Sequence, residues 1–409
     1  MGVDEPGKPP AVPPHGFIPA LEGLRAIAAL GVLVTHVAFQ TGATAWPVLG
    51  RGLGRLDMAV AVFFALSGAL LWRPRAEAAR GLGREPKLRV YLRSRVVRIL
   101  PVYWVVVVAV LVLLPEAGAG WKLWLSNLTL TQVFTPYGLT GGLTQMWSLS
   151  VEMVFYLLLP LFAVGLARLR TSWRVPVLLI AAVASLCWAY LPIDTPDGVH
   201  TDTWMPGYLS WFVAGMLVAE AAAAAAVIAA RGAGAVSGPE RWVLAAGRRR
   251  WSMAALATIA FVASSTDLAG PEGLIRPEPW QFSAKIALGA LIGFGLVAPL
   301  VLRTDRHLLL DHPATLALGR WSYSIFLWHL LVLGAVFPIF GIPAFSGRFL
   351  IVLVATAAIS IVVAAASYAL IEEPVRRRFA RPRPRPRPRP AGTGIADAPA
   401  ATTATTARN

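Results

Sequence analysis

Charged residues and cysteine are scarce in this sequence. Charged residues make up 14% of the 409 residues and hydrophobic residues 56%, whereas roughly a quarter of a soluble domain is charged. The single cysteine, Cys187, excludes an intrachain disulfide and argues against a thiolate metal site. The phosphate-binding motif GxxxxGK(S/T) and the zinc-hydrolase motif HExxH are missing as well. We therefore expect a protein that is not a soluble domain and that holds neither a metal ion nor a tightly bound cofactor.

The apolar residues are grouped in long blocks. Most blocks approach the roughly 20 residues that a helix needs to cross a hydrocarbon core about 30 Å thick. The grouping predicts an all-α fold, a polytopic membrane protein with a bundle of about ten transmembrane helices. The predicted spans are residues 18–39, 58–73, 97–115, 147–167, 174–192, 204–230, 251–266, 281–302, 314–340 and 347–371.

The net charge of +16 is concentrated in alternate loops. The loop that follows the second span is rich in arginine, and arginines also follow the fourth, sixth, eighth and tenth spans. Because basic loops stay in the cytoplasm, both termini are predicted to be cytoplasmic and odd-numbered spans to run outward. No basic face interleaved with aromatic residues occurs, so nucleic acid is not an expected partner. We expect a multi-pass protein of the bacterial plasma membrane, with the lipid bilayer around it.

Three regions follow from composition. Residues 1–16 are predicted to be a disordered tail, residues 17–378 a membrane domain, and residues 379–409 a second disordered tail. The second tail contains an Arg-Pro repeat at 381–390, which is typical of extended polyproline-like chain. It is read either as a plain solubilising tail or as a segment that holds anionic lipid.

Arg25 and His36 are ionisable residues inside the first predicted span, LEGLRAIAALGVLVTHVAF. Their spacing of 11 residues leaves about 20° of net rotation and about 16 Å of rise on a helix. Both therefore lie on one helix face, with Arg25 in the inner half and His36 near the outer end. Snorkelling of Arg25 and an interfacial position for His36 are alternatives, but ionisable residues inside spans commonly mark a pathway or a site.

Glu152 lies in the fourth span, at a depth similar to that of His36. A carboxylate in lipid is costly unless it is paired, so we predict that Glu152 pairs with His36 and prepares the imidazole to act as a general base. A structural contact between helices is the alternative. Asp57, at the start of the second span, is predicted to be either a helix N-cap or a member of the same cluster.

Two further segments carry candidate binding residues. Arg93, Arg95 and Arg98 are expected at the inner mouth of the third span, where they act as topology determinants or donate to phosphates. The ninth span contains Tyr323 and His329, and a helix–helix hydrogen bond is the default interpretation of His329.

Close helix packing is predicted at a run of small residues in the second span. The run is FFALSGALL, and small side chains let two helices approach closely. Its serine lacks the GxSxG context of a nucleophile.

Five segments, in order along the chain, resemble the acyltransferase-3 family of integral-membrane O-acyltransferases. They are FIPALEGLRAIAALGVLVTHV with its Arg–x10–His spacing, AVAVFFALSGALL, LRSRVVRILPVYW, MWSLSVEMVFYLLLP, and LGRWSYSIFLWHLLV with the later IEEPVRR. The resemblance covers residues 17–378. One departure is Ala61, two residues before FF, where the family often has an acidic residue. Asp57, one helical turn earlier, is the candidate substitute.

The resemblance implies transfer of an acyl group, commonly acetyl, from cytoplasmic acyl-CoA to a hydroxyl of a carbohydrate or a glycosylated small molecule. It implies that His36 is the catalytic general base, assisted by Arg25 and Glu152, although an acyl-histidine relay is also open. The three arginines of the third span would bind the phosphates of CoA. The remaining candidates, for substrate binding, are Asp57, Trp147, Ser148, Tyr323 and His329. No fused extracytoplasmic esterase-like domain is expected.

Two other functions remain open. A transporter or flippase for a lipid-linked or small polar solute would also place ionisable residues inside a bundle, although no repeat between the halves is evident. A membrane scaffold that uses the Arg-Pro tail for docking leaves Arg25, His36 and Glu152 without a purpose.

Overall fold

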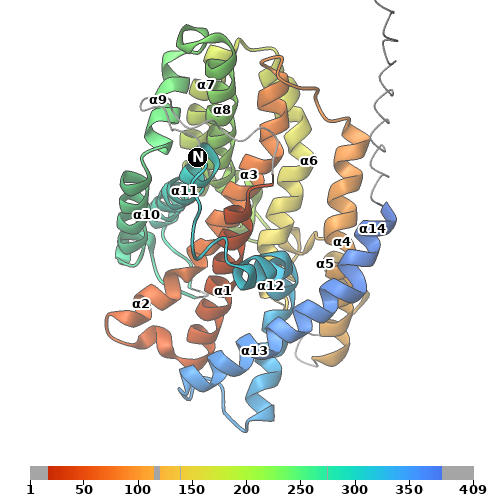
Figure 1. The fold of residues 1–409 in the computed structure, drawn as a ribbon. Helices are drawn as coiled ribbons and strands as arrows, with labels where there is room; N and C mark the ends of the chain where they lie inside the picture. Colours follow the sequence, from red (N-terminus) through yellow and green to blue (C-terminus); the bar gives the residue numbers. More distant parts are fainter. Residues whose placement is uncertain (1–16, 115–119, 139, 274, 380–409) are drawn as a thin grey trace, which may run out of the picture.

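The computed structural model describes residues 17–114, 120–138, 140–273 and 275–379. The described residues form helices joined by turns and loops, with no β-strand among them (Figure 1). The predicted all-α fold is therefore confirmed. The tails predicted at 1–16 and 380–409, with the Arg-Pro repeat, lie outside the described residues.

Nine helical segments of the described chain are long and apolar enough to cross a membrane. They are built around α1 (Pro19–Thr41), α3 (Ala59–Ala78), α4 (Leu88–Leu113), α6 (Trp147–Ala167), α7 (Thr171–Ser185), α8 (Leu209–Arg231), α11 (Pro279–Leu302), α12 (Pro313–Ile339) and α13 (Phe349–Ser367). The seventh predicted span is α10 (Arg250–Ser264), which has only 15 residues. The shorter helices are α2 (Leu49–Gly54), α5 (Trp121–Leu128), α9 (Gly238–Gly247) and α14 (Glu373–Phe379).

Two helices extend further than hydropathy predicts. Helix α3 continues to Ala78, five residues past the predicted end, and α4 begins at Leu88, nine residues before the predicted start. Hydropathy detects only the part of a helix in the apolar layer, whereas arginine and leucine are good helix formers outside it. Consequently all three arginines of the predicted phosphate-binding group lie on helix α4.

Helix α8 lies inside the bundle and is almost entirely buried. It packs against α3, α7 and α11. Glycines make the contact with α3 possible: a Cβ on Gly215 would lie 1.8 Å from the Ala65 carbonyl oxygen, and one on Gly68 would lie 2.0 Å from that of Phe212. The predicted close approach of helices at the small residues of the second span is therefore confirmed.

A second group of helices packs beside this core. Helix α12 contacts both α1 and α13, and together they bury a separate apolar cluster. Figure 1 shows α1 and α12 close together near the middle of the molecule, with α13 crossing beside them. Because Phe326 and Leu327 of α12 belong to the large core while Ile325 and Leu330 belong to the second cluster, α12 joins the two parts.

The loops rich in arginine gather at one end of the bundle, here called the basic end. A buried ionic cluster joins the loop after α3 to α7, α8 and α9: Arg80 lies 2.6 Å from Glu220, Arg174 lies 2.8 Å from Glu220, and Arg80 also pairs with Glu240. Burial lowers the pKa of Arg80, but the two carboxylates outweigh burial and raise that pKa above its ordinary value. A buried charge is tolerated when it is paired in this way.

Candidate active site

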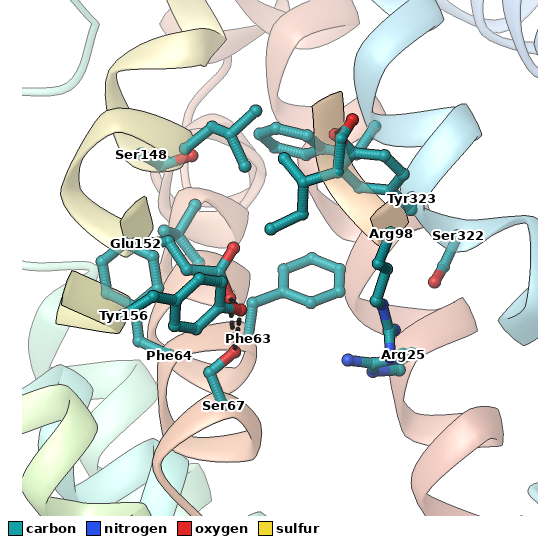
Figure 2. Close-up of a pocket in the computed structure, with 14 residues that line it drawn as sticks. Arg25, Phe63, Phe64, Ser67, Arg98, Ser148, Glu152, Tyr156, Ser322 and Tyr323 are labelled. Carbon is teal, nitrogen blue, oxygen red and sulfur yellow. Dashed lines mark hydrogen bonds between the residues drawn. The ribbon is translucent and has the colours of Figure 1, made fainter. Parts of the chain in front are cut away.

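Two adjoining cavities contain most of the predicted site residues. The first, the arginine cavity, has a volume of about 70 Å³ and lies between α1, α3, α4, α6 and α12. Its polar lining consists of Arg25, Ser67, Arg98, Ser148, Glu152, Tyr156, Ser322 and Tyr323 (Figure 2). The second, the histidine cavity, has a volume of about 530 Å³ and is lined by His36, Asp57, Trp147 and Lys285, among others.

The first cavity has an excess of positive charge on one side. Figure 2 shows the side chains of Arg25, from α1, and Arg98, from α4, pointing toward one another on the same side of this cavity. Arg25 lies 3.8 Å from the Glu22 carboxylate, and its buried Nε has no hydrogen-bond partner among the described residues. Two guanidinium groups arranged in this way favour an anionic ligand.

Glu152 faces the same cavity but does not contact His36. Its Oε1 accepts hydrogen bonds from Ser67 Oγ and Tyr156 Oη, and the two hydroxyls are 3.2 Å apart (Figure 2). The predicted pair of His36 and Glu152 is therefore wrong. Depth along a span was estimated from the sequence, but the rotation of α6 turns Glu152 toward α3. Tyr156, one turn along α6, was missed, although its i,i+4 spacing from Glu152 was a usable signal.

His36 pairs instead with His329 of α12. Nε2 of His329 lies 3.1 Å from Nδ1 of His36, and the ring centroids are 5.0 Å apart. His329 is 1% exposed, whereas His36 is only partly buried and lines the histidine cavity. The default interpretation of His329 as a helix–helix hydrogen bond is confirmed, and His36 is the residue that it contacts.

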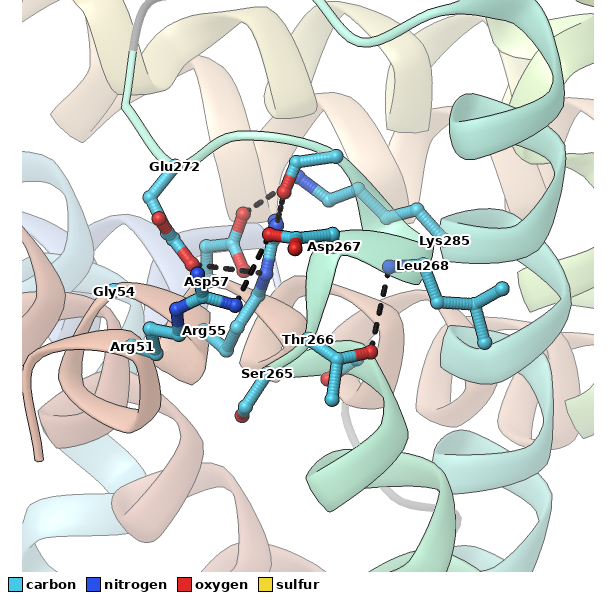
Figure 3. Close-up of polar contacts among 12 residues, drawn as sticks. Arg51, Gly54, Arg55, Asp57, Ser265, Thr266, Asp267, Leu268, Glu272 and Lys285 are labelled. Carbon is cyan, nitrogen blue, oxygen red and sulfur yellow. Dashed lines mark hydrogen bonds and ion pairs between the residues drawn. The ribbon is translucent and has the colours of Figure 1, made fainter. Parts of the chain in front are cut away.

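Asp57 forms an ion pair with Lys285 of α11. The Lys285 ammonium donates to the Asp57 carboxylate at 2.7 Å, and both residues line the histidine cavity (Figure 3). The N-cap alternative is wrong, because Asp57 lies within a 3₁₀ turn, Arg55–Met58, and α3 has no side-chain cap. Lys285 was not among the predicted site residues. It could have been, because it is an ionisable residue inside the eighth predicted span, as Arg25 and His36 are in the first.

The other charged residues around this cavity are paired too. Arg276 lies 3.6 Å from Asp202, and the buried Arg55 lies 3.8 Å from Glu272. Arg55 also donates to the Gly270 carbonyl, which ties the loop before α11 to the turn before α3. This loop forms part of the cavity wall.

The two cavities share Val60, Ser148 and Phe326 in their walls. Arg25 and His36, both on α1, therefore line different cavities, and these three residues form part of both walls. This arrangement agrees with the prediction of two depths along the first span. Ser148 donates to the Gln145 carbonyl at 3.1 Å, and the ring of Trp147 packs against that of Tyr208 at 5.0 Å.

The structure separates the remaining candidates. Arg95 lies over the ring of Tyr156 at 5.8 Å, beside the arginine cavity, whereas Arg93 is exposed and lies over Phe379 at 5.3 Å. Of the three arginines, only Arg98 lines either of these two cavities. The hydroxyl of Tyr323 donates to the Ile99 carbonyl at 2.9 Å and so joins α12 to α4. Within the described ranges, no three His, Cys, Asp or Glu side chains come together as metal ligands.

Comparisons with known proteins find acyltransferases among the relatives of this chain. The chain is 31% identical over 210 residues to the acyltransferase MdmB of Streptomyces mycarofaciens, covering 48% of this chain and 52% of that protein. It is 29% identical over 216 residues to the putative peptidoglycan O-acetyltransferase YrhL of Bacillus subtilis, covering 46% and 31%. It is 27% identical over 216 residues to the peptidoglycan O-acetyltransferase OatA of Listeria monocytogenes, covering 46% and 32%.

These alignments span about half of the first relative's length and about a third of the other two. No solved structure matches the chain. A family model for an acyltransferase domain, Acyl_transf_3, matches residues 18–367, which contain both cavities and all the predicted site residues. This multi-pass membrane chain therefore belongs to the acyltransferase-3 family.

Proposed function

We propose that the protein is a membrane O-acyltransferase that moves an acyl group, most simply acetyl, from acyl-CoA to a hydroxyl group. The observation that carries the proposal is the junction of the two cavities. One contains Arg25 and Arg98, the other contains His36, and they meet at Val60, Ser148 and Phe326. An anionic donor and a hydroxyl acceptor can thus approach one reaction point from two sides.

The arginine cavity is the proposed donor side. Arg98, with Arg95 beside it, is placed to bind phosphate groups of CoA through charge-assisted hydrogen bonds. Arg25 lies deeper on the first helix, where it holds the pantetheine phosphate or stabilises negative charge on the thioester oxygen. Glu152 lines the same cavity and is held there by Ser67 and Tyr156. We therefore propose that Glu152 helps to position the donor.

The histidine cavity is the proposed acceptor side. The acidic and basic side chains that line it are all in ion pairs: Asp57 with Lys285, Asp202 with Arg276, and Glu272 with Arg55. A wall whose charges are balanced suits an uncharged acceptor better than an anionic one. Trp147 and Tyr208 add aromatic surface to the same wall. We therefore propose a neutral, hydroxyl-bearing acceptor such as a carbohydrate or a glycosylated small molecule.

His36 is the proposed general base. Its imidazole removes the proton from the acceptor hydroxyl as the oxygen attacks the thioester carbonyl carbon. The carbon–sulfur bond then breaks, and the proton passes to the thiolate of CoA, so that the products are the O-acyl ester and free CoA. In a relay, His36 attacks the thioester first and passes the acyl group on in a second step.

Acetyl transfer by membranes that contain the His36→Ala variant tests the proposal. We expect transfer from acetyl-CoA to fall by about two to four orders of magnitude, the usual contribution of a positioned acid–base group. His307→Ala, outside both cavities, is the matched control. Undiminished transfer by correctly folded His36→Ala protein would contradict the assignment.

Thermal stability with added CoA compounds separates this proposal from a transporter or flippase. An enzyme that binds acyl-CoA should be stabilised by acetyl-CoA, and less by its 3′-dephospho form, because a ligand that binds only the folded state raises the melting temperature. A transporter of an unrelated solute should show no effect of either compound.

A further inference from the structure

We infer that His329 is a positioning residue for His36: its Nε2 accepts the hydrogen on His36 Nδ1, which holds the ring and leaves Nε2 of His36 as the basic nitrogen. The inference rests on the proposed role of His36 in acyl transfer. It also assigns a different role to His329, for which substrate binding was predicted, because His329 lines neither cavity.

The tautomers of the two rings follow from their neighbours. Nδ1 of His329 lies 2.7 Å from the Phe326 carbonyl oxygen, and Nδ1 of His36 lies 2.8 Å from that of Val32. A carbonyl oxygen can only accept a hydrogen bond. Each Nδ1 therefore carries a hydrogen, and in a neutral imidazole the Nε2 then carries a lone pair.

The contact between the rings has one consistent direction. Nε2 of His329, which has a lone pair, lies 3.1 Å from Nδ1–H of His36. His36 therefore shares its hydrogen between His329 and the Val32 carbonyl. That carbonyl, 2.8 Å from Nδ1, is also the helical acceptor for the backbone N–H of residue 36. The result is a chain of hydrogen bonds from the Phe326 carbonyl through His329 to His36.

This chain has a mechanistic consequence. When His36 takes a proton on Nε2, its ring becomes positively charged and its Nδ1–H becomes a stronger donor. His329 faces that donor with a lone pair and is held by its own bond to α12, so it needs no rearrangement as charge develops. The aspartate of a Ser-His-Asp triad acts on its histidine in the same way, but here the acceptor is a neutral imidazole.

Burial explains why a histidine fits this position. His329 is 1% exposed and is packed beside the ring of Phe326, with centroids 5.9 Å apart. A carboxylate at this place would need a cationic partner. A neutral imidazole needs only one donor and one acceptor, and both are present. Phe326 also lines both cavities. One turn of α12 therefore carries both His329 and a residue of the wall that the two cavities share.

Two substitutions separate hydrogen bonding from packing. His329→Gln keeps a side-chain oxygen near the position of Nε2, whereas His329→Leu keeps bulk but has no acceptor. We expect His329→Leu to lower kcat about tenfold, the effect of one hydrogen bond worth about 1.4 kcal/mol, with the KM for acetyl-CoA unchanged. His329→Gln should recover most of kcat.

A second measurement does not require the hydroxyl-bearing acceptor substrate. Diethyl pyrocarbonate acylates an unprotonated imidazole nitrogen, and mass spectrometry of the peptide locates the product on His36. His329→Leu should slow the modification of His36 about tenfold, and His329→Gln should react nearly as fast as the wild type. The His36→Ala variant is the control: its peptide has no imidazole at position 36, so the mass increase assigned to modified His36 should be absent.

The outcomes are distinct. Equal modification rates and equal kcat in the wild type and both folded variants would overturn the role of His329. Equal loss in both variants would reduce that role to packing and would overturn it as well. Full acetyl transfer by His36→Ala would instead remove the proposed function, whereas the modification rates would still report whether His329 acts on His36.

Discussion

Among the predicted phosphate-binding arginines, Arg98 alone lines either of the two cavities of the site. Arg98→Gln should raise the KM for acetyl-CoA about 10-fold to 100-fold with a smaller change in kcat, because a hydrogen bond to a charged group contributes about 1.5–3 kcal/mol. Steady-state kinetics on the purified protein measures both constants. Arg241→Gln, an exposed arginine of α9 at the basic end, is the control. An unchanged KM in Arg98→Gln would place the CoA phosphates elsewhere.

Glu152 stabilises the helix pair α3–α6 through two hydroxyl groups. Glu152→Leu removes the acceptor of both Ser67 and Tyr156, and an unsatisfied buried polar group costs about 1–3 kcal/mol. We expect a lower melting temperature in detergent for Glu152→Leu. Glu152→Gln, which keeps one acceptor oxygen, should lose less. Equal melting temperatures for Glu152→Leu and the wild type would show that the hydroxyls find other partners.

At the scale of elements, the contact between α3 and α8 depends on glycine. Gly215→Ala places a Cβ 1.8 Å from the Ala65 carbonyl oxygen, so one helix must move, and such overpacking typically costs about 1–3 kcal/mol. The melting temperature and the yield of folded protein should both fall.

Gly165 of α6 is the matched control for this experiment, because it is a helical glycine at which an added Cβ would have no other atom within 4 Å. Gly165→Ala should be neutral or stabilising, since alanine is favoured over glycine in a helix by about 1 kcal/mol. If both variants behaved alike, the close approach of α3 and α8 would not limit stability.

At the scale of the whole molecule, the charge distribution predicts which end faces the cytoplasm. Single cysteines can be introduced at Asp194, in an exposed loop after α7, and at Gly83, in an exposed loop between α3 and α4. The background is Cys187→Ser, because Cys187 is exposed. A membrane-impermeant maleimide added to intact cells should label Asp194→Cys but not Gly83→Cys. The reverse pattern would invert the predicted topology, and with it the assignment of donor and acceptor sides.

Several features of this fold and site could be predicted from local pattern. The fourth predicted span, 147–167, coincides with α6. Arg25 and His36 lie on one helix and line two different cavities, which agrees with the two depths that helical rise predicted. Both results depend on residues close in the chain, for which hydropathy and the 3.6-residue period are sufficient.

The partners of the site residues could not be predicted in this way. His36 contacts a histidine 293 residues later, and Asp57 contacts a lysine 228 residues later. Which helices become neighbours, and how each is rotated about its axis, depends on side-chain packing along whole helices. A glycine pair sets α8 against α3, and the group α1–α12–α13 then brings His329 to His36. Spans, polarity and candidate residues therefore follow from local sequence, whereas pairing and the junction of the cavities follow from packing between helices far apart in the chain.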